Sequence, residues 1–118
     1  MVLGGVWEDL ARQSVARLQV GGESWLPAQR WWGAGQDRRP LEFDLVARHA
    51  TSSDRVLVGE AKVTARPKEV PALLQALAEK TRRCPAFQGK RLDLRLWVLE
   101  GVRQDDARVV AGAGVFGL

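Results

Sequence analysis

Two strand-like runs joined by a short polar segment constrain the fold of this chain more than any other feature. Residues 41–47 (LEFDLVA) and residues 56–63 (VLVGEAKV) are rich in apolar and β-branched side chains. Residues 49–55 between them are polar and have the length of a hairpin loop. The two runs therefore predict neighbouring antiparallel strands.

Charged side chains converge in this predicted hairpin. Side chains on a strand alternate between faces, so Glu60 and Lys62 point the same way and Ala61 points the opposite way. Antiparallel pairing brings Asp44 beside Glu60. Two carboxylates about 4 Å apart repel by about 4 kcal/mol at an effective dielectric near 20, so a Mg²⁺ ion or Lys62 has to balance them. Oxygen ligands for a hard cation, with a positive group nearby, suit metal-dependent phosphodiester cleavage. Structural ion pairs on a wet sheet face are the alternative.

These residues resemble the motif of the PD-(D/E)xK, or restriction-endonuclease-like, nuclease superfamily. Asp44 is followed, after fifteen intervening residues, by Glu60-Ala61-Lys62, and residues 30–33 (RWWG) precede them. The combination is similar to one branch in particular, the nuclease-like C-terminal domain of a family of archaeal and bacterial AAA-type ATPases. The likeness runs from about Trp7 to the end of the chain.

The resemblance implies a fold, a cofactor and a set of site residues. The fold is α/β, with an αβββαβ core and a mixed central sheet flanked by helices. The activity is that of a Mg²⁺- or Mn²⁺-dependent endonuclease, with DNA as substrate and an ATPase domain as partner. Phe43 stands where the family motif has its proline. The implied catalytic residues are Asp44, Glu60 and Lys62, and the implied metal ligands are Asp44, Glu60, Ala61 (through its carbonyl) and Glu8.

The position of Glu8 allows two interpretations. Apolar residues spaced by three and four, beginning at Trp7 and reaching Leu18, predict an amphipathic helix that ends before Gly21 and Gly22. Glu8 lies at the border of the apolar stripe. It either reaches the site at the sheet edge or interacts with the helix dipole as an acid of the N-terminal turn.

The remaining patterns predict a single α/β domain over residues 1–118. The expected order of elements is a helix, three strands, a helix and two strands. A strand, a helix and a further strand form a unit with parallel pairing and a right-handed crossover, and a hairpin joined to it gives a mixed sheet between helices. The predicted strands span 29–32, 41–47, 55–63, 92–99 and 107–111, and the second helix spans 70–81.

The charge pattern favours a polyanionic partner. Residues 62–91 contain eight basic and two acidic residues, a local excess that suits nucleic acid. A solvated helix face is the alternative. The residues expected to contact DNA are Arg66, Lys68, Arg82 and Arg83.

Other features bound the setting of the protein. A single cysteine, Cys84, agrees with a reducing cytoplasm. No apolar stretch approaches the length of a membrane span. The sequence allows either a monomer or a homodimer. The one histidine, His49, falls in a loop and is expected to have no specific role. Trp31 and Trp32 are adjacent in a strand, so one faces inward and the other outward, where it stacks on a base or packs against a partner.

Three functions compete on these grounds. The first is metal-dependent cleavage of DNA by Asp44, Glu60 and Lys62. The second is a catalytically silent nuclease-fold module that binds nucleic acid or its own ATPase. The third is an interaction domain whose tryptophan-rich segment docks a partner. The sequence does not distinguish DNA from RNA.

Overall fold

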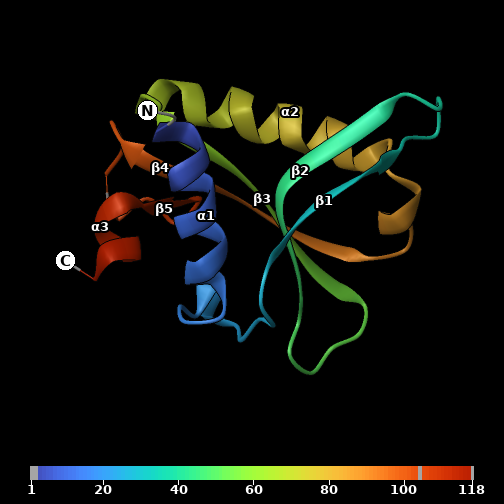
Figure 1. Cartoon of the computed structure of the whole chain (residues 1–118), viewed down its shortest axis with the longest axis horizontal. Helices are drawn as coiled ribbons and strands as arrows, with labels where there is room; N and C mark the ends of the chain where they lie inside the picture. The colour runs from blue at the N-terminus through green and yellow to red at the C-terminus, as the bar shows by residue number, and fades with distance from the viewer. Residues whose placement is uncertain (1–2, 104, 118) are drawn as a thin grey trace.

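Five strands lie side by side in the order in which they follow along the chain (Figure 1). The computed structural model describes residues 3–103 and 105–117. Strand β1 pairs antiparallel with β2, and β2 pairs antiparallel with β3, whereas β3–β4 and β4–β5 are parallel. The predicted hairpins and the predicted parallel crossover are therefore confirmed. The strands are β1 (Gln29–Ala34), β2 (Pro40–Arg48), β3 (Arg55–Thr64), β4 (Arg91–Glu100) and β5 (Val109–Ala111).

Helices precede, interrupt and follow the sheet. The predicted first helix is α1 (Leu3–Val15), which begins earlier and ends sooner than its apolar pattern suggested, and the predicted second helix is α2 (Val70–Arg82). A short α3 (Gly112–Phe116) was not predicted. In the described residues no helix combines the length and apolar character needed to cross a membrane. The described part of the chain also contains three 3-10 turns: η1 (Val20–Gly22), η2 (Pro67–Glu69) and η3 (Pro85–Phe87).

The two long helices cover opposite faces of the sheet, which makes the protein a mixed α/β structure. In Figure 1, α1 lies in front of the sheet and α2 passes behind β2. Alternate residues of one strand serve the two layers, since Trp97 packs with the α1 residues and Leu96 with Val70 of α2. The α1-side core includes Trp7, Ala11, Val15, Leu45, Ala47 and Leu57.

Hydrogen bonds between buried tryptophans and their neighbours fix α1 on the sheet. The Trp7 indole nitrogen donates to the carbonyl oxygen of Trp97 over 3.1 Å, and the Trp97 indole nitrogen donates to Ser14 Oγ over 3.0 Å. Gly59 of β3 lets Trp97 and Leu45 meet across the sheet, because a Cβ there would lie 2.5 Å from the Trp97 ring and 2.6 Å from Leu45. This packing sets the position of α1 beside β2 and β3.

Candidate functional site

Strands β2 and β3 separate at the residue pair Leu45 and Gly59, where their pairing ends. A bulge in β2 accompanies the separation: between two paired positions β1 advances from Gln29 to Trp31 while β2 advances from Val46 to Phe43. The extra residue turns the strand over, so that Phe43 packs on the α2 side and Leu45 on the α1 side. We call this point, with Asp44 of β2 and Glu60, Ala61 and Lys62 of β3, the fork.

Asp44 lies at the fork and is held from two directions. Its carboxylate oxygen Oδ2 accepts a hydrogen bond of 2.8 Å from the backbone N–H of Ala61 in β3. Its own carbonyl oxygen accepts a hydrogen bond of 2.8 Å from Arg12 Nη1 of α1. Asp44 is half-buried, and its side chain bridges the separated strands. Continued pairing would place Asp44 opposite Glu60, but its carboxylate bonds instead to the backbone of the next residue, Ala61.

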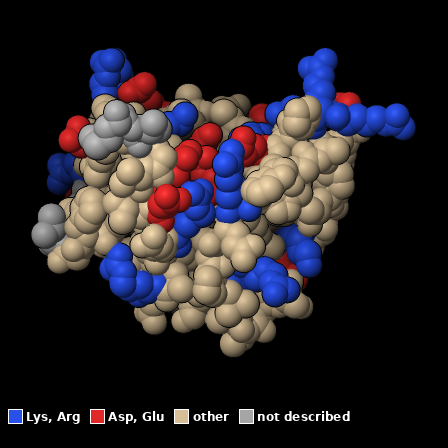
Figure 2. All heavy atoms as spheres, viewed as in Figure 1, with Lys and Arg blue, Asp and Glu red and all other residues tan. Residues whose placement is uncertain are grey.

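Glu8 reaches the same place from α1. It is half-buried, and that burial raises its pKa, as do the negative charge of Asp44 and a hydrogen-bonding contact with the same carboxyl group. Arg12 and Arg30 partly offset this by lowering the pKa of Glu8. Glu8 lies beyond the first turn of α1, so its position favours the site interpretation over the helix-dipole one. In Figure 2, acidic and basic side chains gather near the centre of the face that α1 covers.

Glu60 and Lys62 occupy the β3 side of the fork. Unbroken pairing with β4 and regular alternation place both on the face that carries Val56 and Val58, and turn Ala61 toward the α1 side. Both are half-buried, and neither forms an ion pair or side-chain hydrogen bond with another described residue. A shared cation between the Asp44 and Glu60 carboxylates stays a prediction.

The donor groups at the fork fit a magnesium ion of the kind that keeps several waters. Across residues 3–103 and 105–117, no three histidine, cysteine or acidic side chains are gathered as a ready-made metal cluster. Mg²⁺ is commonly held by one or two carboxylates together with water and other oxygen ligands. Glu8 and Asp44 supply two adjacent carboxylates, and burial together with the negative charge of Asp44 raises the pKa of Glu8, a cost of ionisation that a bound cation would relieve.

The basic residues predicted to contact DNA fall into two separate groups. Arg66 and Lys68 lie just before α2, whereas Arg82 and Arg83 lie at its end. At 1.5 Å per residue, a helix of this length holds the groups about 20 Å apart. Arg66 is ion-paired with Glu69, and Arg82 with Glu79. The basic segment is thus two exposed clusters at the ends of one helix.

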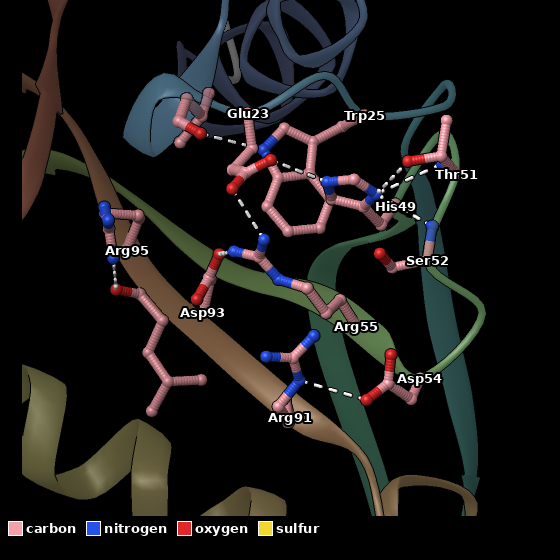
Figure 3. A network of polar contacts seen from close by, with 12 residues as sticks. Glu23, Trp25, His49, Thr51, Ser52, Asp54, Arg55, Arg91, Asp93 and Arg95 are labelled. Carbon is pink, nitrogen blue, oxygen red and sulfur yellow. Dashed lines mark hydrogen bonds and ion pairs between the residues drawn. The ribbon is translucent and has the colours of Figure 1, made fainter.

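A second polar cluster, around Arg55, was not anticipated from the sequence (Figure 3). Arg55 Nη1 lies 2.6 Å from Glu23 Oε1, and its Nη2 lies 3.0 Å from Asp93 Oδ2. The guanidinium also lies over the Trp25 ring, 5.7 Å from its centroid. The His49 hydrogen bond lowers the pKa of Glu23, and the Arg55 hydrogen bond adds to the effect. We call these residues the Arg55 cluster.

His49 belongs to the Arg55 cluster, contrary to the prediction that it has no specific role. Its side chain is only 7% exposed. Its Nδ1 accepts hydrogen bonds from the backbone N–H groups of Thr51 and Ser52, over 3.1 and 3.0 Å. Since Nδ1 is an acceptor, Nε2 carries the proton that it donates to Glu23 over 2.7 Å. The ring closes the loop between β2 and β3.

Comparison of the chain with protein-family models, with curated proteins and with solved structures finds no match. A function for the fork therefore has to be inferred from its own residues.

Proposed function

We propose that this domain is a divalent-metal-dependent nuclease with a restriction-endonuclease-like core, cleaving DNA phosphodiester bonds at the fork. The order α1, β1, β2, β3, α2, β4 is compatible with an αβββαβ core, to which β5 and α3 are added. The mixed pairing of the sheet and the helices on its two faces are compatible with the same core.

The observation that carries the proposal is the fixed Asp44 carboxylate next to Glu8. The Ala61 N–H holds Asp44 in place, while Glu8 faces it and has a raised pKa. Placing two carboxylates together costs stability unless a cation joins them. A cation bound where the two strands open would offset the repulsion that Arg12 and Arg30 balance only in part.

Each residue of the fork has a role in this proposal. Glu8 and Asp44 would hold the metal, which supplies Lewis-acid stabilisation and a water of lowered pKa. The Ala61 carbonyl and Glu60 would add ligands from β3, and Glu60 would have to reach the metal across the strand separation, because it lies on the α2 side whereas Glu8 comes from α1. Lys62 would place a positive charge next to the scissile phosphate, where negative charge develops in the transition state. Its lack of a partner among the described residues leaves the ammonium group available for this purpose.

The proposed partners are DNA and an ATPase that loads the domain onto it. Arg66 and Lys68 before α2 and Arg82 and Arg83 at its end are exposed and would contact phosphates near both ends of the helix. Loading by an ATPase, as a separate protein or a parent chain, would make cleavage by the domain alone slow.

A silent nuclease-fold module that binds without cutting is the second candidate. One observation favours it: the Ala61 N–H already engages Oδ2 of Asp44, as it would in a purely structural role for that carboxylate. The two candidates differ in what happens to the phosphodiester bond.

Cleavage of supercoiled plasmid in Mg²⁺ or Mn²⁺ tests the proposal. The wild type should nick the plasmid, and Asp44→Asn and Glu60→Gln should abolish nicking while the melting temperature stays near that of the wild type. Glu79→Gln is the matched control, because among the described residues that carboxylate pairs only with Arg82, on the exposed side of α2. DNA binding without nicking in either metal, with and without the ATPase partner, would favour the silent module.

A further inference from the structure

Trp32 is the one tryptophan that the structure leaves open to solvent. Its side chain is 70% exposed, the highest value among the large apolar residues in the described part of the chain. Trp7, Trp25 and Trp97 are buried, and Trp31 packs against two phenylalanine rings on the α2 side. The prediction that the adjacent tryptophans face opposite ways is confirmed, and folding does not account for the outward one.

Charged residues orient the Trp32 ring. The Arg30 guanidinium carbon lies 5.7 Å from the centroid of the indole, and the same guanidinium is ion-paired with Glu42 on the neighbouring strand. Trp32 and Glu42 are paired positions of β1 and β2. An arginine held by a carboxylate and laid over an indole keeps the ring in place as a flat platform.

Two hollows flank this platform. One, of about 460 Å³, is lined by Arg30, Trp32, Pro40, Leu41 and Glu42. The other, of about 220 Å³, is lined by residues that include Trp32 and Arg38. Arg38 is exposed and has no ion pair with another described residue. An exposed aromatic ring with one arginine over it and a second arginine lining an adjoining hollow offers a stacking surface and positive charge together, which suits a nucleotide better than an apolar peptide.

The platform adjoins the fork. Glu42 precedes Asp44 by two residues in β2, a distance of about 7 Å along a strand. Arg30, which lies over Trp32, also acts electrostatically on Glu8. A nucleotide strand whose phosphate lies at the fork would therefore bring a neighbouring base to the indole.

We propose that Trp32 stacks on an unpaired base, so that the domain prefers single-stranded DNA, or a duplex with an unpaired base, over a continuous duplex. This inference rests on the proposed function for the identity of the ligand as nucleic acid. In a duplex both faces of each base are covered by neighbours, whereas an unpaired base has a free face for an indole. The preference follows from that difference.

Binding measured without metal tests this inference separately from cleavage. Fluorescence anisotropy in EDTA should show the whole chain binding labelled oligodeoxythymidine more tightly than a blunt duplex of equal length. Trp32→Ala should weaken single-strand binding about 5- to 150-fold and leave duplex binding within about twofold, a margin far below one stacked base. Trp32→Phe should retain most of the single-strand affinity. Phe116→Ala removes another exposed aromatic side chain and should change neither.

The outcomes separate the two proposals. If every fork variant still nicks the plasmid while the single-strand preference depends on Trp32, the nuclease proposal is overturned and the base-stacking proposal stands. Equal weakening of both DNA forms by Trp32→Ala, or no weakening of either, would overturn the platform whatever the plasmid assay shows. A dimer in sedimentation that dissociates in Trp32→Ala, with single-strand affinity unchanged, would overturn it in favour of self-association.

Discussion

The fork and the Arg55 cluster lie at opposite ends of the β2–β3 pair and treat charge in opposite ways. In the Arg55 cluster, Glu23 bridges His49 and Arg55, and Arg55 bridges Glu23 and Asp93. At the fork, the Glu8 and Asp44 carboxylates face each other, and two half-buried charges in β3 have no partner among the described residues. The charged groups at one end of the hairpin are paired with opposite charges, whereas those at the other end are not paired with any described residue.

The two ends therefore serve different purposes. Paired charges with satisfied hydrogen bonds hold a loop in one conformation, although their net contribution to stability is modest. Like charges placed together oppose folding and are expected where a ligand balances them. The pKa values report the same difference, because that of Glu8 is raised and that of Glu23 is lowered.

After the abolished nicking expected of the carboxylate variants, the largest effect comes from removing the positive charge at the fork. Lys62→Ala should lower the rate of plasmid nicking about 10²- to 10³-fold, the range for loss of one transition-state stabilising group. The melting temperature should hardly change, since the ammonium group has no ion pair with a described residue. Rate and melting temperature are measured on the same preparation.

Lys90→Ala is the control for this substitution. Lys90 is exposed, and its one side-chain hydrogen bond to a described residue goes to the carbonyl oxygen of Ser53, away from the fork. Nicking by Lys62→Ala at the wild-type rate would remove this lysine from the proposed chemistry.

The next effect concerns the Arg55 cluster and is one of stability. His49→Ala should lower the free energy of unfolding by about 1–3 kcal/mol, because it strips the acceptor from two backbone N–H groups. Urea unfolding measures the change. Thr51→Ala, which removes a hydroxyl 3.4 Å from the ring, should cost much less. A His49→Ala protein as stable as the wild type would mean that the cluster does not hold the loop.

Periodicity predicted most of the fold, because each element carries its own pattern. The strands and long helices came from alternating or three-and-four spacing of apolar side chains, and the structure has them at nearly the same places. The missed element, α3, is short and rich in glycine, so it has no amphipathic pattern. The bulge at Asp44 was also missed, since it depends on how β1 and β2 pair and not on local sequence.

The candidate site was predictable only in part. Asp44 and the Glu60-Ala61-Lys62 run could be singled out because they interrupt apolar strands. The bond from the Ala61 N–H to Asp44 could not, because alternation alone pairs Asp44 with Glu60. Glu23 and His49 are twenty-six residues apart, and no local spacing indicates that a loop and a strand end will bring them together.

Metal binding should produce a smaller change, and only at the fork. With Mg²⁺ at ten times its dissociation constant, binding to the folded state alone adds about 1.4 kcal/mol to stability. Asp44→Asn should remove this increase, whereas Asp93→Asn, in the Arg55 cluster, should retain it. Thermal melts with and without Mg²⁺ measure both. An equal response to Mg²⁺ in the wild type and Asp44→Asn would place the cation elsewhere.

The smallest effects are expected from two single-atom changes that should have opposite signs. Folding raises the pKa of Glu8 from 4.5, so its ionisation costs stability as the pH rises, and there is no cost below that value. Folding lowers the pKa of Glu23 from 4.5, so its pairing stabilises the fold above that value and is lost as the pH falls through the lower one. Glu8→Gln should therefore be neutral or stabilising at pH 7, by less than about 1 kcal/mol.

Urea unfolding in EDTA at pH 7 and near pH 4 compares the two substitutions. The gain from Glu8→Gln should shrink on acidification, because the wild-type carboxyl becomes protonated and loses its repulsion with Asp44. Glu23→Gln should destabilise at pH 7, and its penalty should shrink on acidification as the wild-type Glu23 is protonated in its turn. If both substitutions destabilised the protein at pH 7, the ionised Glu8 would be stabilising, as Glu23 is. The main physical reason to expect a cation at the fork would then be removed.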